Sequence, residues 1–361
     1  MDNKPKYQVV KEKIISDIKV KDLKYNDPIR SELDMMDLFK VSRHTIRRAI
    51  ADLVNEGWLY RQQGKGTFVD NPEGLKNGTG KSVGVITTYI NDYIFPEIIS
   101  GIEHRISEEG YSMLLGNTNN DIAKERQILT NMMNSKLSGL IVEPTKSVFP
   151  NHNKDLYDQL LAKGIPVLFI HACYGNIQTS FIIEDDIKAG YIATKYLIDQ
   201  GHKFICGIFK QDDMQGHGRY EGYLKALREA DLPIDDFRIV WYTTETKKLV
   251  LEQFKNISLE KLKEQGTGYV IYNDQIANSF IQKMTEGGVS IPEDLSVVSF
   301  DNASIAKNGP VQLTTIAHPK RELGVEAASS LIKLMSKEVT MIKKKFEPEL
   351  IIRNSVSKLV E

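Results

Sequence analysis

The 361-residue chain has the composition of an ordinary globular protein, with 41% hydrophobic and 26% charged residues. No apolar run approaches the about 18 residues that a membrane-spanning helix needs. The N-terminal stretch MDNKPKYQVV lacks the apolar segment of a signal peptide, so we expect a cytoplasmic protein that does not contact membranes. Its two cysteines, Cys173 and Cys206, argue against a disulfide framework and against a clustered zinc site.

Charge is distributed unevenly along the chain. The net charge is −1, but residues 1–70 hold 14 Lys and Arg against 11 Asp and Glu, and the rest of the chain is acidic. A basic N-terminal module on an acidic body is compatible with a DNA-binding domain joined to a second domain. Many solvated domains differ as much, so the charge alone does not decide the function.

The first 70 residues form a pattern of three helices and a hairpin. Apolar spacing predicts helices over 6–24, 31–39 and 43–57 and a hairpin over 58–69 that turns at Gly64-Lys65-Gly66. Ser31 and Ser42 are suited to cap the second and third helices. We therefore expect a winged helix-turn-helix of the α+β class over 1–70.

The third predicted helix carries cations at its start. Arg43, His44 and Arg47 lie on its early turns, mostly off the apolar face. In a helix-turn-helix this end enters the major groove, where a bidentate Arg–guanine pair gives about 1–3 kcal/mol of discrimination. A solvated basic face without a partner is the alternative.

The segment SELDMMDLFKVSRHTIRRAIADLVNEGWLYRQQGKGTFV closely resembles the winged helix of the GntR family. The resemblance implies that DNA is contacted by Glu32, Ser42, Arg43, His44, Thr45, Arg47, Gly64, Lys65 and Gly66. The family usually has Leu-Pro before the Ser-Glu pair, whereas this chain has Ile29-Arg30. Arg30 is therefore an additional candidate for a phosphate contact.

After a Gly- and Asn-rich segment at 71–81, which we interpret as a linker, strands alternate with helices through a second domain over 82–361. Short apolar runs predict strands at VGVIT, SMLLG, GLIVE, PVLFI, FICGIF, IVWY, GYVIY and LSVVSF. Such strands separated by helical stretches indicate a parallel sheet covered on both faces.

Polar and aromatic residues gather after these strands or close to them, where parallel α/β sheets bind ligands. The candidates are Tyr89, Asp92, Tyr93, Phe95, Glu143, His171, Arg219, Asn273, Asp274, Asp301 and His318. Carboxylates, amides and an Arg among aromatic rings match the hydroxyls and C–H faces of a sugar. Any one of them taken alone is more readily a structural residue, such as a helix cap.

The stretches GIEHRISEEGYSMLLGNTNND, KGIPVLFIH, IPEDLSVVSFDN and LTTIAHPKRELG resemble the LacI/GalR effector domain, in that family's order. The resemblance implies a periplasmic-binding-protein-like α/β domain of two Rossmann-like lobes joined by three crossings. It places the first lobe at 82–177 with a return at 319–344, and the second at 178–316 with the C-terminal strand. The family has ligand contacts on the loop after the first strand and at positions matching His171, Arg219, Asn273, Asp301 and His318.

A GntR head on a LacI-type body is similar to the AraR group of arabinose-operon repressors, and TTYINDYIFPEIISGIE and FEPELIIR are closest to that group. The resemblance implies a non-enzymatic homodimer that binds palindromic double-stranded operator DNA and is released by L-arabinose. The alternatives are another pentose or hexose, a sugar-binding module without regulatory output, and a P-loop enzyme. Gly80-Lys81-Ser82 resembles the end of a P-loop, but it precedes a strand and lacks the required earlier Gly.

Overall fold

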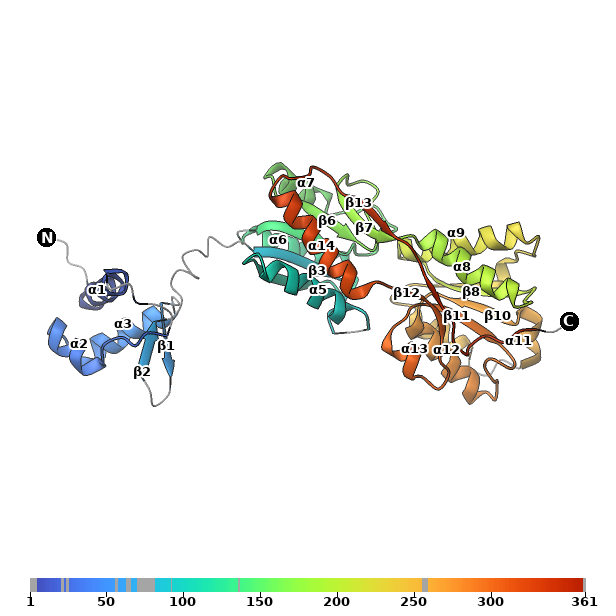
Figure 1. Ribbon diagram of the computed structural model, residues 1–361, viewed down its shortest axis with the longest axis horizontal. Helices are drawn as coiled ribbons and strands as arrows, with labels where there is room; N and C mark the ends of the chain where they lie inside the picture. The colour runs from blue at the N-terminus through green and yellow to red at the C-terminus, as the bar shows by residue number, and fades with distance from the viewer. Residues whose placement is uncertain are drawn as a thin grey trace. The chain divides into compact units, whose positions relative to one another are not determined.

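The computed structural model describes residues 5–20, 23, 26–55, 58–62, 66–69, 82–91, 93–135, 137–254 and 259–359 of the chain. The chain forms two compact units, Met1–Gly80 and Lys81–Glu361 (Figure 1). The expected linker at 71–81 and the expected end of the third helix near Gly57 lie outside the described residues. So do three candidate site residues, Gly64, Lys65 and Asp92.

Among its described residues, the first unit has three helices and a two-stranded antiparallel sheet, which confirms the predicted winged helix-turn-helix. Its elements are α1 (Lys6–Val20), α2 (Glu32–Phe39), α3 (Arg43–Asn55), β1 (Leu59–Gln62) and β2 (Gly66–Val69). Apolar residues at helical spacing, including Ile46, Ile50 and Leu53 of α3, are fully buried in one core. Ser31 caps α2 as predicted, because its hydroxyl accepts a hydrogen bond from the Asp34 amide at 3.2 Å.

The second unit consists of two lobes, each with a six-stranded sheet. Lobe 1 contains β3 (Ser82–Thr87), α5 (Phe95–Ser107), β4 (Ser112–Asn117), α6 (Ile122–Met133), β5 (Leu137–Val142), α7 (Lys154–Ala162), β6 (Val167–Ile170), β7 (Ser180–Glu184), α14 (Lys320–Met335) and β13 (Lys343–Phe346). All its strands are parallel, in the order β13-β7-β6-β5-β3-β4.

Lobe 2 contains α8 (Asp186–Asp199), β8 (Ile205–Lys210), α9 (Met214–Glu229), the 3₁₀ helix η1 (Asp236–Arg238), β9 (Ile239–Tyr242), α10 (Lys247–Gln253), α11 (Leu259–Gln265), β10 (Gly268–Ile271), α12 (Asp274–Glu286), β11 (Ser296–Asp301), α13 (Ser304–Asn308), β12 (Thr314–Ala317) and β14 (Leu350–Ile351). The strand order is β14-β12-β11-β10-β8-β9, and β14 alone among these described strands runs antiparallel to its neighbour. Both lobes therefore have the α/β architecture that the sequence predicted.

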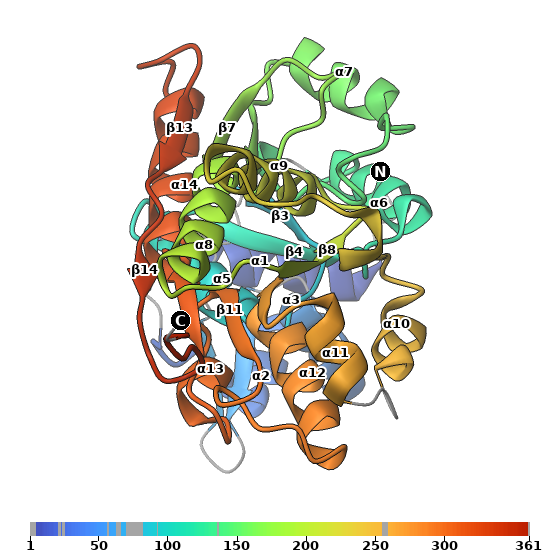
Figure 2. The same cartoon turned by 90° about the vertical axis from the view of Figure 1, so that its right-hand side faces the viewer.

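The chain crosses between the lobes three times, as expected: after β7, between β12 and α14, and between β13 and β14. These strands lie at one edge of each sheet, and Figure 2 shows β13 and β14 in red along one side of the unit. The expected boundary at 177/178 was wrong. Residues 180–184 form β7 and pair with β6 and β13, so lobe 1 continues to Glu184.

Candidate functional site

In the first unit, the predicted DNA-contacting cations project from the start of α3. Arg43 and Arg47 have side chains that are 59% and 55% exposed. Both donate through Nε to the carboxylate of Glu32, at 3.2 and 3.0 Å, and Arg61 Nη2 lies 4.0 Å from the same carboxylate. Burial raises the pKa of Glu32, but the bonds from Arg47 and Arg43 outweigh it and the pKa is lowered. Glu32 thus gathers three arginines on one exposed surface.

The remaining described candidates of this unit are Arg30, Ser42, His44, Thr45 and Gly66. Ser42 accepts a hydrogen bond from the Thr45 amide at 3.3 Å, and the two hydroxyls lie 2.9 Å apart. His44 and Arg30 are exposed. Gly66 begins β2 with a φ of +127°, a backbone conformation that favours glycine. These positions remain predictions as DNA contacts.

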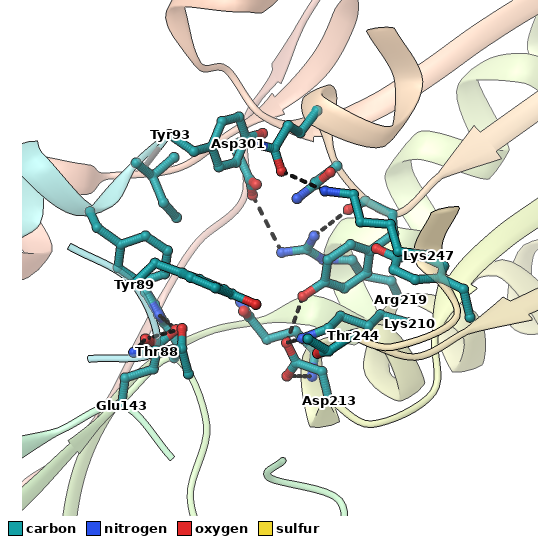
Figure 3. Close-up of a pocket in the computed structure, with 18 residues that line it drawn as sticks. Thr88, Tyr89, Tyr93, Glu143, Lys210, Asp213, Arg219, Thr244, Lys247 and Asp301 are labelled. Atoms are coloured by element: carbon teal, nitrogen blue, oxygen red, sulfur yellow. Dashed lines mark hydrogen bonds and ion pairs between the residues drawn. The ribbon is translucent and has the colours of Figure 1, made fainter. Parts of the chain in front are cut away.

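In the second unit, a cavity of about 180 Å³ lies between the lobes at the carboxyl ends of their strands (Figure 3). Lobe 1 lines it with Thr88, Tyr89, Tyr93, Ile94, Phe95, Glu143 and His171. Lobe 2 lines it with Lys210, Asp213, Gln215, Arg219, Tyr242, Thr244, Lys247, Tyr272, Asn273, Gln275 and Asp301. The cavity is smaller than the about 300–1,000 Å³ typical of sites for drug-sized ligands, which favours a small ligand.

On the lobe 1 side, Glu143 organises the wall of the cavity. One of its oxygens accepts hydrogen bonds from the amide and the hydroxyl of Thr88, both at 2.7 Å, and the other lies 3.1 Å from His171 Nδ1. Burial lowers the pKa of His171, but the hydrogen bond and charge of Glu143 outweigh it, and the pKa is raised. Glu143 therefore holds the imidazole in one orientation at the cavity surface.

On the lobe 2 side, Arg219 is the central cation, with only 3% of its side chain exposed. Its Nε donates to Asp186 at 2.9 Å, and its Nη2 lies 3.6 Å from Asp301 Oδ1 and 3.8 Å from Glu184 Oε2. Helix α9 brings it there by packing closely on α8. A Cβ on Gly190 would lie 2.0 Å from the Arg219 carbonyl oxygen, so that position requires glycine.

Lys210 and Asp213 form a second charged pair at the cavity, partly buried, with Nζ and Oδ2 3.6 Å apart. Tyr272 donates its hydroxyl hydrogen to the same carboxylate at 2.6 Å. Burial raises the pKa of Asp213, but the charge of Lys210 outweighs it and the pKa is lowered. Asp213 is therefore a fixed acceptor at the cavity wall.

His318 lies beside the cavity, at the second crossing, and does not line it. Its Nε2 is 3.0 Å from His171 Nε2 and 3.2 Å from Glu184 Oε1. Burial raises the pKa of Glu184 to about 8, with Asp186 adding to the effect, and burial also lowers the pKa of His318. A chain of buried groups thus runs from Glu143 through both histidines to the first crossing.

Most of the described effector candidates meet at the cavity: Tyr89, Tyr93, Phe95, Glu143, His171, Arg219, Asn273 and Asp301. Asp274 does not. Its carboxylate is fully buried and accepts hydrogen bonds from Ser299, Thr315 and the Ala303 amide, which makes it part of the lobe 2 interior. Asp274 is therefore a structural residue, which was the alternative considered for each candidate from the sequence.

Ten lining residues were not predicted from the sequence, among them Lys210, Asp213, Tyr242 and Tyr272. All four lie at the end of strands β8, β9 and β10 or within three residues after them, and those strands had been predicted. The same strand-end rule would have found them if it had been applied to every strand.

Three lining residues hold unusual backbone angles. Tyr93, His171 and Asp301 have φ values of 65°, 63° and 98°. Non-glycine residues in this region are strained, and such strain gathers at ligand sites and switches. Within the described ranges, no group of three or more His, Cys, Asp or Glu is placed to hold a metal ion.

Comparisons with known proteins match both units. Residues 6–69 match the model of the bacterial regulatory proteins of the gntR family, and residues 194–356 match the periplasmic binding protein-like domain. An arabinose metabolism transcriptional repressor from Halalkalibacterium halodurans is 40% identical over 98% of this chain and 96% of its own length. The chain belongs to this repressor family. The repressor therefore joins a GntR-type DNA-binding domain to a LacI-type effector domain, as the sequence predicted.

Solved structures support the two-lobe fold of the repressor. The transcription regulator CcpA of Lactococcus lactis matches with a TM-score of 0.68 and 27% identity, over 77% of this chain and all of that one. A periplasmic binding protein/LacI transcriptional regulator from Alkaliphilus metalliredigens, complexed with D-xylulofuranose, matches with a TM-score of 0.65 and 26% identity, over 77% of this chain and 99% of its own. Every helix in the described part of the chain is too short or too polar to span a bilayer.

Proposed function

We propose that L-arabinose binds in the cavity between the lobes and lowers the affinity of the repressor for its operator, so that genes of arabinose uptake and catabolism are expressed. The protein acts in the cytoplasm as a homodimer on a palindromic operator and carries out no catalysis. The observation that carries the sugar assignment is the full-length similarity to an arabinose metabolism repressor, joined to a small, polar cavity.

The cavity suits a small neutral sugar. Apart from His171, three cationic side chains, Lys210, Arg219 and Lys247, are balanced by three carboxylates, Glu143, Asp213 and Asp301. A sugar phosphate or sugar acid would add one or more negative charges without a matching cation, and burying an unmatched charge is costly. The neutral set instead offers donors and acceptors for hydroxyl groups.

Aromatic rings complete the sugar-binding character of the walls. Tyr89 and Phe95 lie in edge contact on the lobe 1 side, with ring centroids 5.8 Å apart, and Tyr242 and Tyr272 do so on the lobe 2 side at 6.0 Å. A pyranose presents C–H groups on its faces and hydroxyls at its rim. Rings from both lobes can cover those faces while the charged groups bind the rim.

Coupling to DNA follows from the layout of the chain. A ligand that contacts both lobes stabilises one arrangement of them, and in a dimer this arrangement sets how the two DNA-binding heads are presented. Dimer symmetry requires matching half-sites in a palindrome. Couplings of this kind amount to about 1–3 kcal/mol.

The test is a screen of monosaccharides by thermal unfolding, followed by operator binding in the presence of each hit. L-arabinose should raise the unfolding temperature, because a ligand of the folded state stabilises it. It should also release a labelled operator duplex. Operator binding that persists at saturating L-arabinose contradicts the proposal, and release by another pentose or hexose alone corrects the sugar.

A binding-site variant makes the test specific to the cavity. Glu143→Gln keeps the size of the side chain but removes the charge that faces His171 Nδ1 in the cavity wall. L-arabinose should then bind less tightly while operator binding in the absence of sugar stays unchanged. Unchanged sugar affinity in this variant would place the sugar elsewhere.

A further inference from the structure

Direct contacts join the two lobes on the side of the cavity away from the three crossings. They involve Asn120, Lys146 and Ser147 of lobe 1 and Asp212, Asp213, Thr244 and Glu245 of lobe 2, together called the latch here. These residues belong to four loops, one after each of the strands β4, β5, β8 and β9.

The sheet topology places the latch far from the hinge. The crossings follow β7, β12 and β13, which lie with β14 at one edge of their sheets, whereas β4 and β9 form the opposite edges. Rotation of one lobe about the crossings therefore moves the latch loops apart more than it moves residues near the crossings. The latch bonds exist only while the lobes are closed on one another.

Asn120 is the buried centre of the latch. Its Nδ2 donates across the lobes to Asp212 Oδ2 at 3.1 Å and to Thr244 Oγ1 at 2.6 Å. Its Oδ1 accepts a hydrogen bond from the Lys146 amide at 2.8 Å, which fixes the β5 loop next to it. Only 3% of Asn120 is exposed, so these bonds are shielded from water.

Two further contacts flank Asn120. The Ser147 hydroxyl donates to Asp213 at 3.2 Å and accepts from the amide of Met214 at 2.9 Å. Met214 is the first residue of α9, and amides at a helix start have no partner within the helix, so Ser147 of the other lobe supplies one. Lys146 Nζ contacts Glu245 Oε1 at 2.5 Å, which lowers the pKa of Glu245 to about 2.

The latch shares residues with the cavity wall. Asp213 accepts from Ser147 in the latch and from Tyr272 in the cavity. Lys210, which lines the cavity, lies 3.7 Å from Asp212 Oδ1 and 3.6 Å from Asp213 Oδ2. A ligand bound by Lys210 or Asp213 therefore contacts the same groups that hold the latch loops.

We propose that this latch sets the concentration of sugar at which the repressor responds. Its bonds raise the population of the closed lobes, and a sugar that needs the closed lobes binds more tightly in proportion to that population. Asn120, Lys146 and Ser147 are positioning residues that act through lobe closure without touching the ligand. The expected effects on sugar affinity rest on the proposed function.

The experiment uses the full chain and compares Lys146→Met, Asn120→Ala and Ser147→Ala with wild type. L-arabinose affinity is measured by calorimetry and its dissociation by stopped flow. Lys146→Met removes a partly exposed ion pair and should weaken binding by about two- to fivefold. Asn120→Ala removes buried hydrogen bonds to a carboxylate and should weaken it by roughly tenfold or more. Dissociation should become faster in both.

Lys154→Met is the matched control. Lys154 pairs with Asp158 at 2.6 Å on the same helix of lobe 1, so the substitution removes an ion pair without touching lobe closure. Its sugar affinity should equal that of wild type. Urea unfolding of each variant shows whether a lowered affinity reflects loss of the fold.

A second measurement needs no sugar. The amide of Met214 donates across the lobes to Ser147, so its hydrogen exchange reports opening of the latch. Lys146→Met, which does not touch Met214, should speed that exchange by about two- to fivefold, whereas Lys154→Met should not.

The sugar-binding measurements and the exchange measurement at Met214 distinguish a failure of the latch from a failure of the sugar assignment. If wild type fails to bind L-arabinose but Lys146→Met speeds exchange at Met214, the latch stands and the sugar assignment fails. If wild type binds L-arabinose and the three latch variants match it in affinity, dissociation and exchange, the latch is overturned. Unchanged exchange at Met214 in Lys146→Met overturns it even without a sugar.

Discussion

The two units use their charged residues in opposite ways. In the DNA-binding unit, Arg43 and Arg47 are more than half exposed and are gathered by Glu32, whose pKa they lower. In the effector unit, Arg219 is almost fully buried among three carboxylates, and the pKa of one of them, Glu184, is raised to about 8.

The difference follows from the ligands. A DNA backbone is a polyanion, so exposed cations attract it, and the attraction weakens with salt. A neutral sugar gains little from a long-range field. Its site instead needs donors and acceptors that are fixed in place, and buried ion pairs provide them. Removing one partner of such a pair is strongly destabilising, because the other charge is left buried and unpaired.

The largest expected effect is that of Arg219→Met. It leaves Asp186, Glu184 and Asp301 without their shared cation, and breaking a buried ion pair costs about 3–5 kcal/mol. Urea unfolding of the effector unit measures the loss. Arg126→Met is the control, since Arg126 binds Asp155 on the surface, and it should lower the free energy of unfolding far less. Equal losses would refute the contrast between buried and exposed charges.

The second effect depends on pH and comes from Glu184. Because its folded-state pKa of about 8 lies above the ordinary 4.5, folding favours the protonated carboxyl. That stabilisation is complete below pH 4.5 and is lost as the pH rises through 8. Glu184→Gln should therefore gain stability relative to wild type, on the order of 2 kcal/mol, as the pH rises from about 5 to about 8.5. Urea unfolding across this range checks it, and a pH-independent difference contradicts it.

Arg43→Ala should act on the other unit alone. Loss of a base or phosphate contact should weaken operator binding by about 1–3 kcal/mol and reduce its salt dependence. Binding of L-arabinose should stay unchanged. Fluorescence anisotropy with an operator duplex at several salt concentrations measures the first effect, and calorimetry the second. Parallel loss of both activities would mean that the two units do not divide the work.

Ser31→Ala should have the smallest effect. It removes the hydroxyl that accepts the Asp34 amide at the start of α2, and such caps contribute about 1 kcal/mol. Thermal unfolding of the DNA-binding unit should show the loss while the effector transition stays in place. A shift in the effector transition would show that the units unfold together.

The sequence predicted the first unit well because its signals are local. Ser31 stands one residue before an apolar helix, and Ile46, Ile50 and Leu53 repeat at helical spacing. Neither feature depends on distant parts of the chain. The contacts of Glu32, by contrast, depend on the packed fold. Its arginine partners come from α3 and β1, and only the packing of these elements brings them together.

In the effector unit, the residues at strand ends could be predicted from the sequence, but which of them meet across the two lobes could not. His171 and Arg219 meet the same cavity because β6 and α9 belong to facing lobes. Strand β13 was missed because its residues, Lys343–Phe346, have no apolar pattern, as suits an edge strand that is largely exposed. Asp274 follows strand β10 and Asp301 is the last residue of β11, but only Asp274 turns into the interior, and the sequence does not show that difference.

Reciprocity between the two binding sites tests the central claim, that sugar bound by the effector unit controls DNA binding by the head. If L-arabinose weakens operator binding by some factor, then operator DNA must weaken L-arabinose binding by the same factor, about 5- to 150-fold. Calorimetric titration of the full chain with L-arabinose, with and without saturating operator duplex, measures this directly. Sugar affinity should fall by that factor when the operator is bound, and an identical affinity in both titrations would show that the two sites are not coupled.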